Sequence, residues 1–166
     1  MRVTILGSGS AYGLPMIFNT WGNANPDNPK NERTRASIFI EAEGKSILID
    51  SGPELRLQIN KNNIKNIDSV FITHAHYDHC GLLPVLTKNG YRGNIYATPA
   101  TRDLANIVMM DSARIQARDA EFLAKQARKK GEKFHWKPLF TEDDCVKAAN
   151  QIVSLSYNRK MYISPE

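Results

Sequence analysis

Apolar residues in the first part of the chain occur in short runs that are either continuous or alternate with polar residues, a pattern typical of β-strands. The runs predicted to be strands are RVTILG, ASIFIEA, SILIDSG, SVFIT and GNIYATP. The second and third runs flank EGK, a turn-forming segment, so they predict an antiparallel hairpin. Between the first two runs, residues 21–35 are rich in Asn and Pro and predict an irregular surface loop.

A helical period replaces the strand pattern after Pro99 and continues to Gly131, so one long helix is predicted. The apolar residues expected to share one face of it are Leu104, Ile107, Val108, Ile115 and Phe122. Thr141 and the acidic residues after it predict a short second helix, because threonine caps helix N-termini and carboxylates complement the helix dipole. The last apolar segment, IVSLSY, is predicted to be a strand.

The composition is that of a single globular unit. The chain has 166 residues, of which 42% are hydrophobic and 23% are charged, so it can bury one sizeable core and is too short for two. No apolar run approaches the roughly 20 residues of a membrane span, and the N-terminus reads as a strand and not as a signal peptide. We therefore expect a cytoplasmic protein without membrane contact. Cys80 and Cys145 match no disulfide framework, which indicates two reduced thiols.

The formal net charge of +5 and the pI near 9.2 favour anionic partners, nucleic acids among them. A basic run near the end of the long helix could contact an RNA backbone, or it could complement the helix dipole and keep the surface soluble. This run consists of Lys125, Arg128, Lys129, Lys130 and Lys133.

Three weaker features also have a functional and a structural interpretation. Arg33 and Arg35 could steer a phosphate or form a solvated loop edge. Trp21 and Trp136 could stack on a base, although burial is commoner for tryptophan. The GSGS turn at residues 7–10 lacks the spacing of a dinucleotide-binding loop, which favours an ordinary glycine turn over a phosphate contact.

The strongest chemical signal is the segment THAHYDHCG, residues 73–81, which follows an apolar strand. His74 and His76 are one residue apart in an extended segment, so they can project to one side and share one metal ion. Asp78 and His79 can then converge on a second ion close by. Such a metal pair polarises a phosphoryl or carbonyl oxygen and activates a water. The structural alternative is a loop of mutually hydrogen-bonded histidines, an interpretation that suits the isolated His135 better than this cluster.

These residues resemble the H-x-H-x-D-H signature of the metallo-β-lactamase-fold hydrolases, and Asp50 in LIDSG is similar to that family's earlier strand-end aspartate. The resemblance implies an α/β fold in which residues 1–166 form a single partial domain, the N-terminal part of an αββα sandwich. Residues 1–85, with GSGSAYGLP, resemble the branch that contains phosphodiesterases of phosphonate breakdown. Residues 82–166, with KPLFTEDD, resemble the β-CASP ribonucleases that process RNA ends, so the chain reads as a mosaic.

The resemblance also implies residue roles and a cofactor. His74 and His76 would bind the first metal and Asp78 and His79 the second, and Asp78 would be catalytic because it orients or deprotonates the attacking water. The implied cofactor is zinc, up to two ions, with manganese and iron as alternatives. We expect Asp50 to be buried and to hydrogen-bond the histidine loop, since such partners fix ligand orientation.

The family's remaining ligands lie on later strands, and only His135 follows His79 in this chain. Two hypotheses remain. The chain is a zinc-dependent hydrolase of phosphodiester bonds, with RNA as a candidate substrate, whose other ligands come from a partner chain, a second copy or a longer parent protein. Alternatively, it is a truncated or degenerate metal-binding half-domain without activity of its own. In both cases we expect a poor catalyst when alone, and an apolar sheet face open to a homo-oligomer or a partner chain.

Overall fold

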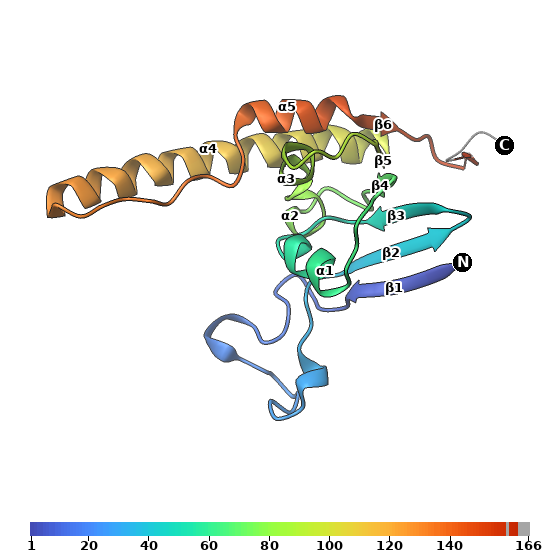
Figure 1. The fold of residues 1–166 in the computed structure, drawn as a ribbon, viewed down its shortest axis with the longest axis horizontal. Coiled ribbons are helices and arrows are strands. Elements are labelled where there is room, and N and C mark those ends of the chain that lie inside the picture. Colours follow the sequence, from blue (N-terminus) through green and yellow to red (C-terminus); the bar gives the residue numbers. More distant parts are fainter. Residues whose placement is uncertain (159, 163–166) are drawn as a thin grey trace.

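The computed structural model describes residues 1–158 and 160–162, and its centre is a six-stranded sheet whose strands lie in chain order (Figure 1). The strands are β1 (Arg2–Gly7), β2 (Ser37–Ala42), β3 (Lys45–Ile49), β4 (Ser69–Phe71), β5 (Asn94–Ala97) and β6 (Ile152–Ser154). The first three are antiparallel to one another, and β3 to β6 are parallel. Because helices connect the parallel strands, the predicted α/β class is confirmed.

The predicted hairpin is formed by β2 and β3, which pair in the register Phe39 to Leu48 and Ala42 to Lys45. Its two turn residues, Glu43 and Gly44, both have positive φ angles of 50° and 73°. Positive φ at both central positions is the geometry of the tight turn that matches strand twist. The segment at residues 21–35 is irregular apart from the 3-10 turn Pro29–Asn31, as its composition predicts, and a second such turn, Ile17–Asn19, precedes it.

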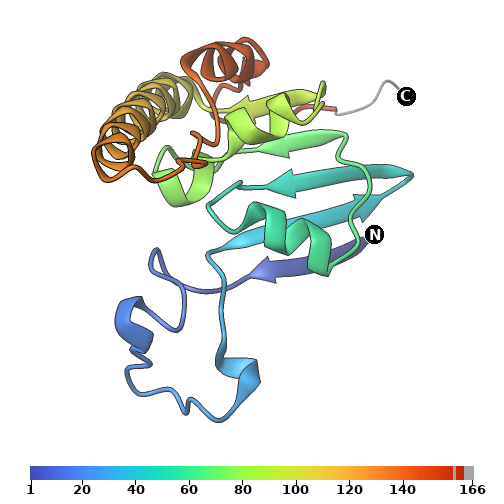
Figure 2. The ribbon, with the colours of Figure 1, turned by 60° about the vertical axis from the view of Figure 1, so that its left-hand side comes forward.

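Helices cover one face of the sheet and build a single core against it (Figure 2). They are α1 (Leu55–Lys61), α2 (Tyr77–Cys80), α3 (Leu83–Lys88), α4 (Pro99–Lys130) and α5 (Glu142–Asn150). On the sheet side, Leu48, Val70 and Ile95 lie side by side in register and are fully buried. Leu83 of α3 and Met109 of α4 complete the same cluster. Burying this apolar area supplies the main driving force for folding.

The opposite face of the sheet is also apolar but is far less buried. Ile5, Ile38, Ile49 and Phe71 are neighbours in register across four strands. Of these, Ile5 is 68% exposed, and the other three are partly exposed. The described part of the chain therefore leaves an apolar sheet face open, which is the surface expected from the sequence.

The long helix predicted after Pro99 is confirmed as α4, which begins at the Thr98 cap and ends at Gly131, where φ is 70°. The apolar residues expected to share one face do not form the buried face of the helix, and of the five only Val108 packs, partly buried, against the core. Leu104 is 55% exposed and Phe122 is 61% exposed, and Ile107 and Ile115 are exposed to similar degrees. Small or flexible side chains face the core instead, and they are Thr101, Ala105, Met109, Ala113 and Ala127. Small residues let the helix axis approach the sheet and α5 closely, whereas the large apolar residues lie a third of a turn away.

The predicted second helix is confirmed as α5. The Thr141 hydroxyl accepts a hydrogen bond from the backbone N–H of Asp144, and the Asp144 carboxylate accepts one from the N–H of Thr141. Two N–H groups at the start of the helix, which have no partner within the helix, are thereby satisfied. This pairing with Thr141 and the nearby lysines lower the pKa of Asp144, although burial acts in the opposite direction. The predicted last strand is confirmed over Ile152–Ser154. Helices α1 and α3 were not predicted from the sequence.

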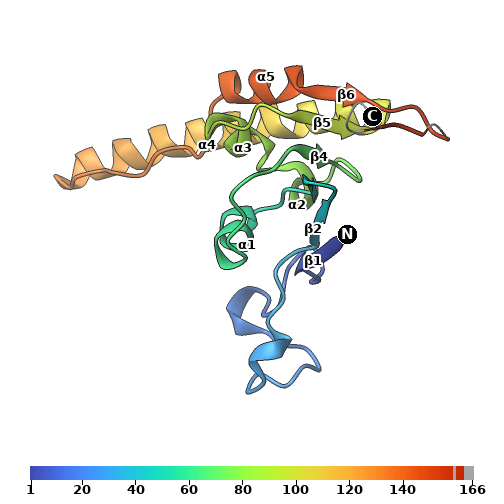
Figure 3. The same ribbon diagram turned by 45° about the vertical axis from the view of Figure 1, so that its right-hand side comes forward.

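The second half of α4 extends beyond the rest of the molecule, and residues 131–139 return alongside it (Figures 1 and 3). No helix in the described residues combines the length and the apolar character required to cross a membrane.

Truncating a residue on each face tests which face carries the core. Leu48→Ala removes a fully buried side chain and is expected to lower the free energy of unfolding by about 2–5 kcal/mol, measured by urea titration. Ile5→Ala on the open face is expected to cost about 1 kcal/mol or less. Equal losses from the two substitutions would contradict the assignment of the core to the helix-covered face.

Candidate metal centre

The histidine segment lies at the carboxyl end of β4, where the chain leaves the parallel part of the sheet. Residues 73–76 form a loop, and α2 begins at Tyr77 as a single helical turn capped by His76. The N–H groups of His79 and Cys80 both donate to the carbonyl oxygen of His76, which closes this turn. Because β3 is the parallel neighbour of β4, its carboxyl end with Asp50 lies at the same edge. Such edges of open α/β sheets are common positions for functional residues.

Asp50 connects the ends of the two strands through its side chain. Asp50 is 4% exposed, and its carboxylate accepts hydrogen bonds from the Thr73 N–H at 2.9 Å, the Thr73 hydroxyl at 2.8 Å and Nδ1 of His79 at 2.7 Å. The backbone of Asp50 has a φ of 65°, a conformation that Asp and Asn tolerate better than most residues. The geometry therefore places a buried acceptor under the histidine loop.

The backbone after Asp50 holds α2 directly. The N–H of Ser51 donates to the carbonyl oxygen of His79 at 2.6 Å, and the N–H of Leu82 donates to the carbonyl oxygen of Ser51 at 3.0 Å. Gly52 lies so close to α2 that a Cβ atom there would collide with the backbone carbonyl oxygen of Asp78. A glycine is required at this position because only a residue without a side chain permits that approach.

The hydrogen-bond network fixes the tautomers of two histidines. The Thr73 hydroxyl gives its single proton to Asp50, so it can only accept at its 3.0 Å contact with Nδ1 of His74. A carboxylate likewise only accepts, so Nδ1 of His79 carries the proton that it shares with Asp50. In the neutral form of each ring the lone pair is consequently on Nε2, which is the form that binds a metal.

The ring positions and the neutral form of His74 suit a metal ligand. The His74 ring centroid lies 3.9 Å from that of His79 and 4.7 Å from that of His76. Burial lowers the pKa of His74, and the neighbouring His79 and His76 lower it further. A lowered pKa keeps His74 neutral near pH 7, and a neutral imidazole is the metal-binding form.

Asp78 and His79 have the separation expected of two ligands of one ion. Nε2 of His79 lies 3.4 Å from Oδ2 of Asp78. Two ligands at about 2.0–2.1 Å from a tetrahedral zinc ion are about 3.3–3.4 Å apart. The donor chemistry and this pair therefore fit a divalent metal. Within the described residues, however, no group of three or more His, Cys, Asp or Glu side chains is arranged to hold one ion.

The two cysteines are buried thiols. Cys80 adjoins the histidine loop, but it is fully buried and its Sγ contacts the carbonyl oxygen of Ala75 at 3.6 Å. Burial raises the pKa of the Cys80 thiol to about 12, and Asp50 and Asp78 contribute to the rise. Burial likewise raises the pKa of Cys145 to about 11. Both thiols are unpaired and protonated at neutral pH, so Cys80 packs against the loop.

The arginines and glycines of the N-terminal loops have structural partners. Arg35 pairs with Glu54 and donates to the Ala11 carbonyl oxygen at 2.7 Å, while Arg33 donates to backbone carbonyls of its own loop. The N–H of Gly9 donates to the carbonyl oxygen of Thr34 at 2.8 Å, so the GSGS turn packs on this loop. These contacts support the structural interpretation of both features.

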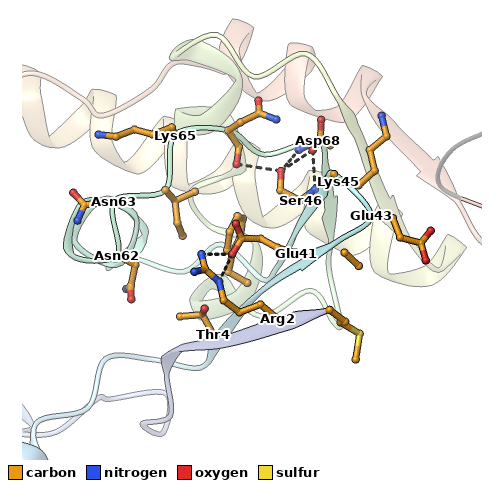
Figure 4. Close-up of a pocket in the computed structure, with 16 residues that line it drawn as sticks. Arg2, Thr4, Glu41, Glu43, Lys45, Ser46, Asn62, Asn63, Lys65 and Asp68 are labelled. Carbon is orange, nitrogen blue, oxygen red and sulfur yellow. Dashed lines mark hydrogen bonds and ion pairs between the residues drawn. The ribbon is translucent and has the colours of Figure 1, made fainter.

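A pocket at the opposite end of the sheet has a volume of about 910 Å³ (Figure 4). It contains none of the predicted site residues, and several of its polar groups bond to one another. Arg2 pairs with Glu41, and Asp68 accepts hydrogen bonds from the N–H and hydroxyl of Ser46, both at 2.7 Å. The Ser46 hydroxyl lowers the pKa of Asp68.

One contributor to the centre was not predicted from the sequence. Thr73 links Asp50 to His74 through its hydroxyl group, and its N–H anchors the same carboxylate. The sequence signal that could have identified it is its position directly before the first histidine of the cluster.

Comparisons with known proteins agree with this geometry. The profile of the Metallo-beta-lactamase superfamily matches residues 31–149. Transcription termination factor FttA of Pyrococcus horikoshii is 34% identical over 93% of this chain and 24% of that protein. A ribonuclease of Thermus thermophilus is 36% identical over 54% of this chain and 22% of that protein. The chain thus spans about a fifth of the length of these relatives.

A solved structure shows the same likeness in three dimensions. A diphosphatase from the PhnP family superposes with a TM-score of 0.53 and 31% sequence identity, over 64% of this chain and 45% of that one.

Replacing the buried anchor tests whether it orients the histidines. Asp50→Asn keeps a residue that tolerates the positive φ but puts an amide donor where Thr73 and His79 require an acceptor. We expect zinc affinity to fall by about 10–100-fold in a competition titration with a chromophoric chelator.

The matched control is Asp68→Asn, which removes a carboxylate that also accepts from a serine or threonine N–H and hydroxyl, at the other end of the sheet. It should leave zinc affinity unchanged. Equal affinities of the Asp50→Asn variant and the unmodified chain would contradict the orienting role.

Proposed function

Because the chain belongs to the metallo-beta-lactamase superfamily, we propose that it is a metal-dependent hydrolase of phosphodiester bonds and that RNA is its substrate. The observation that carries the proposal is the pair of metal-binding histidine tautomers beside Asp78, all anchored at one sheet edge. The relatives support the substrate class, since one is a ribonuclease and one a transcription termination factor. The diphosphatase likeness supports chemistry at phosphorus.

Superfamily membership implies that the protein binds a divalent metal, and we propose zinc. His74 and His76 would hold one ion, and Asp78 and His79 would hold a second. Imidazole nitrogen with carboxylate oxygen is a donor set that suits zinc, with manganese and iron as the other candidates. When bound, such ions supply Lewis-acid polarisation of a phosphoryl oxygen and a more acidic water.

The protein side chains have separate tasks in this proposal. Asp78 orients the attacking water and accepts its proton, because its carboxylate is only partly exposed and faces Nε2 of His79. Asp50 keeps the proton of His79 on Nδ1 and thereby keeps Nε2 free for the ion. Thr73 does the same for His74.

We further propose that residues 1–166 act as one partial domain of this fold in the cytoplasm. The support is that the chain superposes on less than half of the diphosphatase chain, while one sheet face remains open in the described residues. A further segment, a second copy or a partner chain would cover that face.

A second candidate function follows from the ligand geometry. The described residues bring together pairs of donors and no group of three or more. A metal-binding module without activity of its own would have this arrangement. The enzyme predicts slow turnover by the chain alone, and the metal-binding module predicts none.

Hydrolysis of bis(p-nitrophenyl) phosphate by the purified chain, with and without zinc, separates the two candidates. The enzyme predicts slow, zinc-dependent release of nitrophenol that EDTA abolishes. Asp78→Ala should reduce the rate by about 10²–10⁴-fold, or to the zinc-only background, because it removes both a ligand and the proton acceptor.

His135→Ala is the control, since His135 is exposed and distant in sequence from the cluster. It should retain the full rate. Metal binding without any hydrolysis above background would establish the second candidate, and hydrolysis that Asp78→Ala leaves intact would contradict the proposed site.

A further inference from the structure

The positive charge of the protein is concentrated in one segment. Residues 122–139, here called the basic arm, contain six Lys or Arg residues and one Glu, a net charge of +5. The whole chain has 22 basic and 17 acidic residues, so its formal net charge is also +5. The remaining residues are therefore balanced, with sixteen basic and sixteen acidic side chains. The excess charge of the sequence is a local property of the basic arm.

The basic arm is the end of α4 together with the segment that returns beside it, and both project away from the core (Figures 1 and 3). Its base is fixed at two points. The N–H of Leu139 donates to the side-chain oxygen of Gln116 at 2.8 Å, and Arg114 pairs with Glu142 at 3.1 Å. At a rise of about 1.5 Å per residue, the helix between Arg114 and Lys130 projects roughly 24 Å.

The cations of the basic arm are available to a ligand. All six are exposed, and none forms a salt bridge with another side chain in the described part of the structure. They are Lys125, Arg128, Lys129, Lys130, Lys133 and Lys137. Two aromatic rings accompany them, Phe122 at 61% exposure and Trp136 at 43%. Large aromatic side chains this exposed on a projecting segment contribute little to the core.

Aromatic and basic side chains are intermixed on the helix surface. Phe122, Lys125 and Lys129 are spaced by three and four residues, so they share one face of α4. A membrane-surface helix instead separates an apolar face from a basic one. Cations beside exposed rings are the combination that binds single-stranded nucleic acid, in which phosphates meet Lys or Arg and bases stack on aromatic rings.

Helix α4, whose outer end belongs to the basic arm, begins near the candidate metal centre. It follows the carboxyl end of β5, the parallel neighbour of β4, and it contacts α2, which carries Asp78 and His79. We propose that the basic arm is a docking site for single-stranded RNA, which holds the phosphate backbone and stacks bases on Phe122 and Trp136. This inference rests on the proposed function, because it names the surface that would hold a long substrate near that site.

A charge-matched pair of variants tests the docking site. The arm variant replaces Lys125, Arg128, Lys129 and Lys133 with Gln. The control variant replaces four exposed cations of the same types on the hairpin, α1 and the loop that follows with Gln, and these are Lys45, Arg56, Lys61 and Lys65. Both variants have the same net charge, so a difference between them reports the position of the charges.

Binding of a fluorescein-labelled 20-nucleotide oligouridylate is measured in EDTA by anisotropy over a range of salt concentrations. The arm variant should bind about tenfold or more weakly than the control, and its slope of log affinity against log salt should be smaller by about 3, since each phosphate contact contributes about 0.7. Equal affinity and slope in the two variants would overturn the docking site. Arm-dependent binding to phosphatidylserine vesicles with no RNA binding would also overturn it.

Trp136 provides an independent signal of stacking. The sequence has two tryptophans, so Trp21→Phe leaves Trp136 as the single reporter. Oligouridylate should quench its fluorescence, and Trp136→Ala should weaken binding by about tenfold if one base stacks on the ring. Unchanged fluorescence at saturating oligouridylate would overturn the stacking contact.

Failure of the docking site and of the proposed function can be distinguished. The arm variant should hydrolyse bis(p-nitrophenyl) phosphate at the rate of the unmodified chain, because this small ester does not reach the arm. Arm-independent RNA binding with intact ester hydrolysis would overturn only the docking site. Arm-dependent RNA binding in a chain that never hydrolyses the ester would overturn only the proposed function.

Discussion

A carboxylate buried beneath a loop must be satisfied by several donors, and the structure depends on how Asp50 meets this requirement. Its oxygens take a backbone N–H and a hydroxyl from Thr73 and a ring N–H from His79. These donors come from the end of β4 and from α2, so one side chain fixes a strand end, a loop and a helix relative to β3. The positive φ of Asp50 and the absence of a side chain at Gly52 are the backbone conditions that make the arrangement possible.

The same hydrogen-bond network gives the two ring nitrogens of His74 and of His79 different roles. Nδ1 of His74 and of His79 each bond to the protein network, and Nε2 of His79 lies beside Asp78. The protein thus sets the protonation pattern of the rings before any ligand arrives, which lowers the reorganisation that binding requires. Charge is distributed unevenly as well, since the excess cations lie in the basic arm and the remaining residues are balanced.

The sequence predicted the elements with a strong local signal. The hairpin, the long helix with its glycine stop and the capped α5 have turn or cap residues that act within a few positions, and all three are confirmed. Helices α1 and α3 are only seven and six residues long, too short to display a helical period, so they were missed. The large apolar residues that share one face of α4 are not the residues it buries, because burial depends on what packs against the helix, and α5 and the sheet accept small side chains there.

For the candidate site, the residue pattern identified the cluster and the buried aspartate, whereas the bonds of Thr73 depend on a strand pairing that spacing alone does not reveal. The roles of the four predicted ligands stay predictions, because the described residues show two close donors and no larger group. The family resemblance found from these motifs is confirmed by the superfamily match.

Helix α4 is continuous in hydrogen bonding but not in burial, and its two halves therefore differ in local stability. From Thr101 to Ala113 a buried stripe ties the helix to the core, and beyond it only Ala127 is buried. Amides in the first half should exchange with solvent only on global unfolding, whereas those in the second half open by local fraying at a much smaller free-energy cost. Gln116, which holds the returning chain at Leu139, lies near the boundary between the two regimes. One helix thus joins two cooperative units, and any polyanion that orders the outer unit would slow its hydrogen exchange without altering that of the core.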